Sequence, residues 1–315
     1  MTSGVRSGLA GLRLFAAAWR TVARTAWAPL ALYLAGLLIA LPLAVALAYQ
    51  VRGDLDRSVP ASAAGELDAE WWAEYRGHAR GLAATFVPAA AGVSAPLSNL
   101  SALLEATPRA WILVGPVSAY LLAGTWIWAG LLVQWTGRAR PRLSEFAAGA
   151  NARFTDVLRV NLAAMIAVGL SFAVLHPVLF GPLLNGLLPA DGSERTAFLG
   201  RLAAYAAFGG WLVTLGVCAD YARIVSVSGP RRSLAAIARV AVGLIRERWR
   251  PISVVLLMTA CCAALLLFAY AAVELRGGTR VGGWRAVLLA QGYVLARVGL
   301  RAIHVAAHVG VARGA

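Results

Sequence analysis

Long apolar segments alternate with polar, arginine-containing segments along the 315-residue chain. A helix needs about 20 mostly apolar residues to cross the hydrocarbon core of a membrane. Six segments meet this requirement: Trp27–Tyr49, Trp111–Trp135, Val160–Leu184, Leu202–Val225, Ile252–Val273 and Trp284–Val309. The pattern predicts an all-α, polytopic membrane protein that forms a single integral membrane domain over residues 1–315, with six transmembrane helices arranged as three hairpins.

Amphipathic stretches precede three of these spans, in residues 8–34, 143–166 and 231–257. In the third stretch, Arg232, Arg239 and Arg246 recur every seven residues, which places them on one helix face, with Ile237 and Ala241 on the apolar face. Such helices are expected to lie flat in the membrane interface with arginine toward the phosphates. The chain therefore reads as three copies of one unit, in which an interfacial helix precedes a span out and a span back.

The loop at residues 51–108 separates the first two spans and holds seven of the chain's 14 acidic residues. We expect two short helices there, Gly65–Ala83 with its tryptophans and Pro96–Ala106 with its leucines. The loop is too short for a separate globular domain, so it is expected to lean on the outer membrane surface.

Composition agrees with the membrane interpretation, because hydrophobic residues make up 60% of the chain, more than a soluble domain carries. All 29 basic residues are arginine, and with the N-terminus inside, 17 of them face the cytosol beside four acids. The opposite side holds ten arginines and ten acids. This bias predicts that both termini are cytosolic. The net charge of +15 predicts contact with anionic membrane lipid rather than nucleic acid, because the chain lacks a basic soluble segment.

Ionisable side chains inside predicted spans mark a candidate polar cluster, whose members are Asp220, Gln291, Tyr293, Arg297 and Arg301. Asp220 in the fourth span and Arg301 in the sixth lie at comparable depths, which predicts a salt bridge, with Arg297 as the alternative partner. Two interpretations stay open. The charges form a structural pair that sets helix register, or they line a polar pathway or a notch for a lipid headgroup.

Catalytic and metal-binding patterns are weak in this sequence. His304 and His308 share a helix face, but they lack the neighbouring carboxylate or thiol pattern of a metal site. The three cysteines lie within spans without a CxxC spacing, and the HExxH, P-loop and GxSxG motifs are absent. We therefore expect neither an enzyme nor a bound metal or other cofactor.

Four stretches carry a resemblance to a known family, at residues 65–92, 98–108, 220–233 and 291–301. They resemble an uncharacterised bacterial family of six-span membrane proteins found in Acidobacteria-like and Gemmatimonas-like genomes. The three-hairpin plan is also distantly similar to the membrane domain attached to some glycerophosphodiester phosphodiesterases, but their catalytic barrel is missing here. The resemblance implies a location in the bacterial cytoplasmic (inner) membrane and a topology, without an activity.

These observations lead to two functional hypotheses. The first is a non-catalytic inner-membrane protein that organises lipid or partner proteins through its arginine-rich inner helices and its tryptophan-rich outer loop. The alternative is a small transporter or permease subunit with a polar path near Asp220, Arg297 and Arg301.

Overall fold

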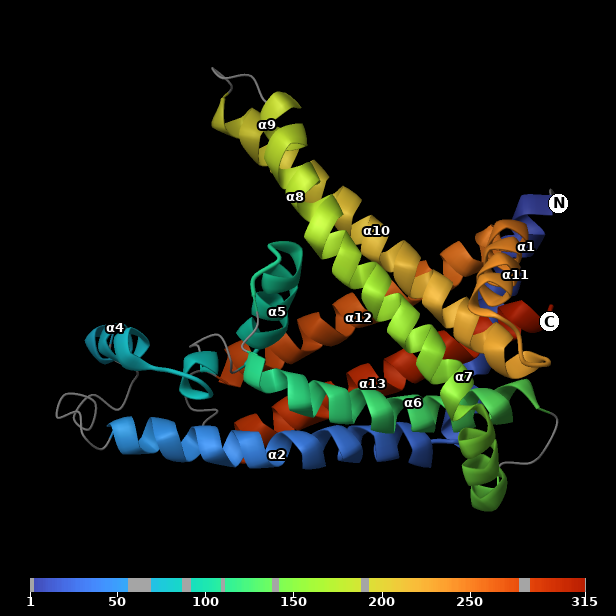
Figure 1. The fold of residues 1–315 in the computed structure, drawn as a ribbon, viewed down its shortest axis with the longest axis horizontal. Helices are drawn as coiled ribbons and strands as arrows, with labels where there is room; N and C mark the ends of the chain where they lie inside the picture. The colour runs from blue at the N-terminus through green and yellow to red at the C-terminus, as the bar shows by residue number, and fades with distance from the viewer. Residues whose placement is uncertain are drawn as a thin grey trace.

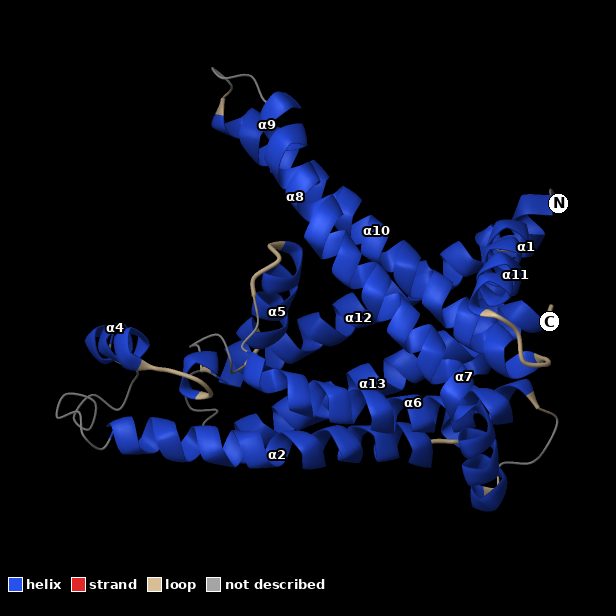
Figure 2. Ribbon diagram, in the orientation of Figure 1, coloured by secondary structure: helices blue, strands red, loops and turns tan. Residues whose placement is uncertain are grey.

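The structure is a computed structural model that describes residues 3–55, 69–86, 92–108, 111–137, 142–187, 193–277 and 284–314. Within these residues the chain is helical and contains no strand (Figure 2). Six helical segments of the described chain are long and apolar enough to cross a membrane: Trp27–Asp54, Trp111–Thr136, Leu143–Leu183, Glu194–Ser228, Trp249–Arg276 and Trp284–Arg313. The predicted all-α, six-span fold is therefore confirmed.

The first three spans include α2 (Trp27–Leu55), α6 (Val114–Thr136) and α7 (Leu143–Leu170). Beyond α7 the third span continues without a break through η4 (Ser171–Leu175), α8 (His176–Val178), η5 (Leu179–Leu183) and α9 (Leu184–Leu187). The two η segments are π-helical turns that flank or contain Pro177 and Pro182. Proline lacks a backbone N–H and crowds the preceding turn, so a widened turn lets the helix continue.

The remaining spans are α10 (Glu194–Ser228), α12 (Trp249–Gly277) and α13 (Trp284–Arg313). Figure 1 shows α2, α6 and α13 running side by side, while the hairpin of α7–α9 and α10 leans away from them. The two groups converge where α1 (Ser3–Arg24) and the last turn of α13 lie, which we call the terminal end. They diverge toward the opposite end.

Buried side chains gather at the terminal end, where helices from all three hairpins meet. Phe15 of α1, Leu131 of α6, Ile224 of α10 and Ile303 of α13 belong to one buried cluster. Farther along the spans, apolar side chains such as Phe268, at 73% exposure, face outward. Exposed apolar side chains on a spanning helix are expected, because lipid tails replace the protein core as their surroundings.

Two amphipathic helices accompany the spans at the terminal end, α1 and α11 (Leu234–Glu247). In α11, Ile237 and Ala241 are buried, whereas Arg239 and Arg246 are exposed, in agreement with the predicted stripes. A short break separates α1 from α2 and α11 from α12. The middle copy differs, since α7 runs from its amphipathic part into the membrane as one helix.

The segment between α2 and α6 contains α4 (Ala69–His78), η1 (Ala83–Thr85), α5 (Ser94–Leu104) and η3 (Trp111–Leu113). The start of the predicted helix Gly65–Ala83 lies outside the described residues, and α4 ends earlier than predicted, before a turn in which Gly81 has a φ of +59°. The segment that contains α5 bridges the leaning hairpin and α12, which packs against α13. The N–H of Val93 donates to the Glu274 carboxylate of α12 (2.6 Å), and His176 Nε2 of α8 donates to the Leu104 carbonyl (2.9 Å).

Candidate functional site: an intramembrane polar network beside a cavity

Asp220 of α10 is the centre of a charged cluster inside the membrane spans, with a side chain that is 1% exposed. Its carboxylate accepts hydrogen bonds from Nη1 and Nη2 of Arg301 on α13, at 2.8 and 2.5 Å. Arg223, one helical turn along α10, donates to Oδ1 at 2.6 Å. His304 Nε2 lies 3.5 Å from Oδ2. A carboxylate in these surroundings requires such partners, because an unpaired charge in hydrocarbon is costly.

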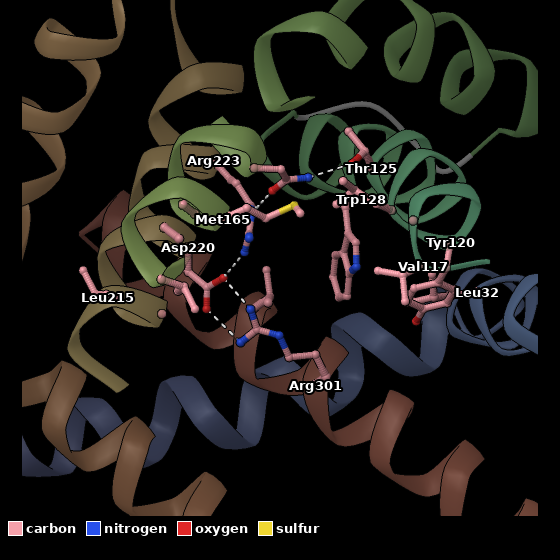
Figure 3. A pocket seen from close by; sticks show the side chains of 18 of the residues that line it. Leu32, Val117, Tyr120, Thr125, Trp128, Met165, Leu215, Asp220, Arg223 and Arg301 are labelled. Carbon is pink, nitrogen blue, oxygen red and sulfur yellow. Dashed lines mark hydrogen bonds and ion pairs between the residues drawn. The ribbon is translucent and has the colours of Figure 1, made fainter. Parts of the chain in front are cut away.

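The network continues from Arg223 through α7 of the same hairpin into the first hairpin (Figure 3). Arg223 Nε donates to Asn161 Oδ1 of α7 at 2.6 Å, and Asn161 Nδ2 donates to Thr125 Oγ1 of α6 at 2.7 Å. On the other side, the Thr259 hydroxyl of α12 lies 3.0 Å from His304 Nδ1. Hydrogen bonds and ion pairs thus connect five helices drawn from all three hairpins.

His308, one turn beyond His304 on α13, belongs to an adjoining contact. Its Nδ1 lies 3.1 Å from the Tyr221 hydroxyl, and both side chains are fully buried. The rings of His304 and His308 pack edge to face with centroids 4.3 Å apart. Across the described part of the chain, no three His, Cys, Asp or Glu residues are arranged to hold a metal ion.

The five residues predicted as one polar cluster fall into two groups, and four of the five lie on α13. The structure pairs Asp220 with Arg301 rather than with Arg297. Gln291 instead accepts a hydrogen bond from the Tyr33 hydroxyl of α2 at 2.9 Å. Tyr293 stacks on Tyr270 of α12 with ring centroids 4.7 Å apart, and the Arg297 guanidinium lies 5.7 Å from the Tyr293 ring centroid. The polar residues therefore follow one another along α13 and do not form one compact cluster.

A cavity of about 1080 Å³ adjoins the network between the two diverging groups of helices. Its charged lining residues are Asp220, Arg223, Arg297 and Arg301. The rest of the lining is mainly apolar, with Val117 and Trp128 of α6 facing Met165 of α7 in Figure 3. Leu103 of α5 also lines it, so the bridging helix borders the cavity.

A second, smaller cavity of about 350 Å³ lies among α10, α12 and α13. Thr259 and His304 are among its lining residues. Asp220, Arg297 and Arg301 line both cavities. The central ion pair therefore stands between two spaces within the spans.

Several network members were not singled out from the sequence as site residues. Arg223 follows Asp220 by three positions, a spacing that puts both on one helix face and was available as a signal. Asn161 is a polar residue near the start of a long apolar run. Its partner Thr125 carried no sequence signal, because threonine is common in spanning helices and can bond its own backbone.

Comparison with family models, with curated proteins and with solved structures finds no match for this chain. Its chemistry must therefore be read from the residues themselves. Guanidinium groups bind carboxylates and phosphates through paired hydrogen bonds, and the apolar walls suit hydrocarbon. This combination favours binding of an amphipathic molecule.

Proposed function

We propose that this protein is a non-catalytic membrane protein of the bacterial cytoplasmic membrane that binds and organises lipid inside the bilayer. The observation that carries the proposal is the division of the lining of the large cavity between four charged residues, Asp220, Arg223, Arg297 and Arg301, and a mainly apolar remainder. A membrane lipid has the same division between headgroup and acyl chains. The volume of the cavity, about 1080 Å³, is at the upper end of the range for ligand pockets, which suits a segment of a lipid.

Access from the bilayer supports a lipid as the occupant. Val117, Met165 and Leu103 line the cavity, yet they are 56%, 49% and 46% exposed. Because apolar side chains of the lining remain this accessible, the cavity is open to the surface between the helices. A lipid enters through such an opening sideways, without first leaving the membrane.

The proposed orientation has the terminal end in the cytosol. The arginine excess of the loops at that end supports it, because cytosolic loops of membrane proteins are enriched in positive residues. The exposed arginines of α1 and α11, such as Arg13 and Arg239, then face the anionic inner leaflet.

Lipid retention tests the proposal. The protein is purified in a mild detergent, and the phospholipid retained per protein chain is measured by mass spectrometry. The variant Gly169→Trp places a large ring in the cavity, since Gly169 lines it and an added Cβ meets nothing within 4 Å. The control Gly210→Trp adds the same ring at an open position that does not line the cavity.

The proposal expects lipid on the wild type and on Gly210→Trp, and a clear loss on Gly169→Trp. Equal retention by all three proteins would show that the lipid lies elsewhere on the surface.

The shared lining of the two cavities favours one alternative, a transport path past the Asp220–Arg301 pair. Reconstituted vesicles that contain a fluorescent lipid separate the two functions. Transport predicts that the protein accelerates lipid exchange between leaflets. It also predicts that Gly216→Trp, which adds a large ring at a position that lines both cavities, slows this exchange. Binding alone predicts no acceleration over protein-free vesicles.

A further inference from the structure

We infer that the cavity selects a lipid with an anionic phosphodiester headgroup and that Arg297 anchors this headgroup. The inference rests on the proposed function, and it adds the charge of the lipid headgroup and the residue that binds this headgroup. It starts from the charges that line the cavity. Three arginines and one aspartate leave an excess of positive charge that the lining does not itself neutralise.

The Asp220 carboxylate is already occupied. Both of its oxygens accept hydrogen bonds from Arg301, and Oδ1 also accepts one from Arg223. The Nε of Arg223 donates to Asn161 and its Nη1 donates to Asp220. Its remaining nitrogen, Nη2, has no acceptor among the described residues and can donate to a ligand. Asp220 therefore neutralises one of the two arginine charges that contact it, and among these described residues it makes no ion pair with the third lining arginine.

Arg297 is this third arginine, and Asp220 does not contact it. It lies near the middle of α13, where a charge is most costly if it faces hydrocarbon alone. Within the described ranges, no carboxylate lies at ion-pair distance from its guanidinium, and no side chain or backbone oxygen accepts a hydrogen bond from it. The Tyr293 ring, 5.7 Å away, offers it only a cation–π contact. A ligand anion in the cavity would supply the missing counter-charge.

A phosphodiester lipid fits both parts of the cavity. Its phosphate accepts paired hydrogen bonds from a guanidinium, and its acyl chains cover the apolar walls at Val117, Trp128 and Met165. A soluble anion such as inorganic phosphate would match the arginines but would leave the apolar walls uncovered. A zwitterionic lipid brings a second, positive group that the lining arginines repel. Charge complementarity therefore favours an anionic lipid.

Competition between two lipids of matched acyl chains tests the inference. The full-length protein in detergent is offered phosphatidylglycerol, phosphatidylcholine and inorganic phosphate, and bound molecules are counted by native mass spectrometry. We expect phosphatidylglycerol to bind in preference to phosphatidylcholine, and Arg297→Gln to weaken phosphatidylglycerol binding about tenfold. Binding of phosphatidylcholine should weaken less in this variant, because its choline already opposes the contact between its phosphate and the lining arginines.

The matched control is Arg285→Gln on the same helix. Arg285 also lies over an aromatic ring, that of Trp284 at 5.7 Å, but it does not line the cavity. Its loss should leave the lipid preference unchanged. The thermal midpoint of each variant shows that it is folded, and Arg297→Gln should not lower it, because the residue has no ion pair to lose among the described residues.

The outcomes separate the inference from the proposed function. Equal binding of the two lipids by the wild type would overturn the inference and leave a lipid-binding cavity in place. Loss of all lipid binding would overturn both. Displacement of phosphatidylglycerol by inorganic phosphate at equal concentration would indicate a soluble-anion site and would contradict the lipid assignment.

Discussion

The carboxylate of Asp220 on α10 accepts two hydrogen bonds, of 2.8 and 2.5 Å, from the guanidinium of Arg301 on α13. The pair joins the second hairpin to the third at a point where Asp220 is 1% exposed. Because the partners come from different hairpins, their interaction holds the packing of the hairpins as well as neutralising two charges.

Removing one member of this pair is expected to destabilise the protein strongly. Asp220→Ala leaves Arg301 and Arg223 without their carboxylate, and loss of one partner of a buried ion pair costs about 3 kcal/mol or more. Thermal unfolding of the purified protein in detergent measures the effect. In Asp220→Ala/Arg301→Ala the second substitution should cost less than it does alone, since it removes one of the two uncompensated charges.

A second cycle with Arg297→Ala is the control for this prediction. Arg297 lines the same cavity, but Asp220 and Arg297, both described in the structure, make no ion pair with each other. The coupling energy between Asp220 and Arg297 should therefore be smaller. Fully additive losses for Asp220 and Arg301 would show that the two side chains do not act as a pair.

The close contact between α6 and α7 depends on the absence of a side chain at Gly130. A Cβ added there would overlap the ring of Phe146. This ring is 1% exposed and packs edge to face against Trp27 and Trp126, at centroid distances of 4.7 and 5.4 Å, so it cannot move aside. Gly130→Ala is therefore expected to cost about 2 kcal/mol, as overpacking typically does, and to lower the thermal midpoint.

Gly115→Ala provides the comparison on the same helix, because a Cβ there meets nothing within 4 Å. It should unfold at the wild-type temperature. If the two alanine variants are equally stable, then α6 and α7 do not approach as closely as described.

The orientation of the chain makes a third prediction. Green fluorescent protein fluoresces when it is made in the cytosol, and alkaline phosphatase is active only outside it. Fused after Gly314, Gly137 or Gly229, the fluorescent reporter should be active, because the arginine-rich loops stay inside. Fused after Leu187 or Gly277, the phosphatase should be active instead. The reverse pattern would place the terminal end outside the cytosol and remove the support for the proposed orientation.

Much of the fold could be predicted because the bilayer imposes few solutions on a chain. Apolar runs of spanning length must become helices, since every backbone polar group in hydrocarbon needs a partner. Trp27, Trp249 and Trp284 begin helices in the structure near the predicted bounds. Burial of a charge likewise demands an opposite charge at the same depth, and this reasoning predicted the contact between Asp220 and Arg301.

Residue order alone therefore set the six spans, their polar interfaces and the depth of each charge. Depth, however, does not say which faces of two helices meet. The link from Arg223 through Asn161 to Thr125 depends on how α6, α7 and α10 are rotated and spaced. The same packing, tight at Gly130 and diverging beyond it, opens the cavity and leaves Arg297 beside it without a carboxylate among the described residues. Such rotation and divergence arise from the shapes of many side chains in contact, which no periodic pattern along the chain records.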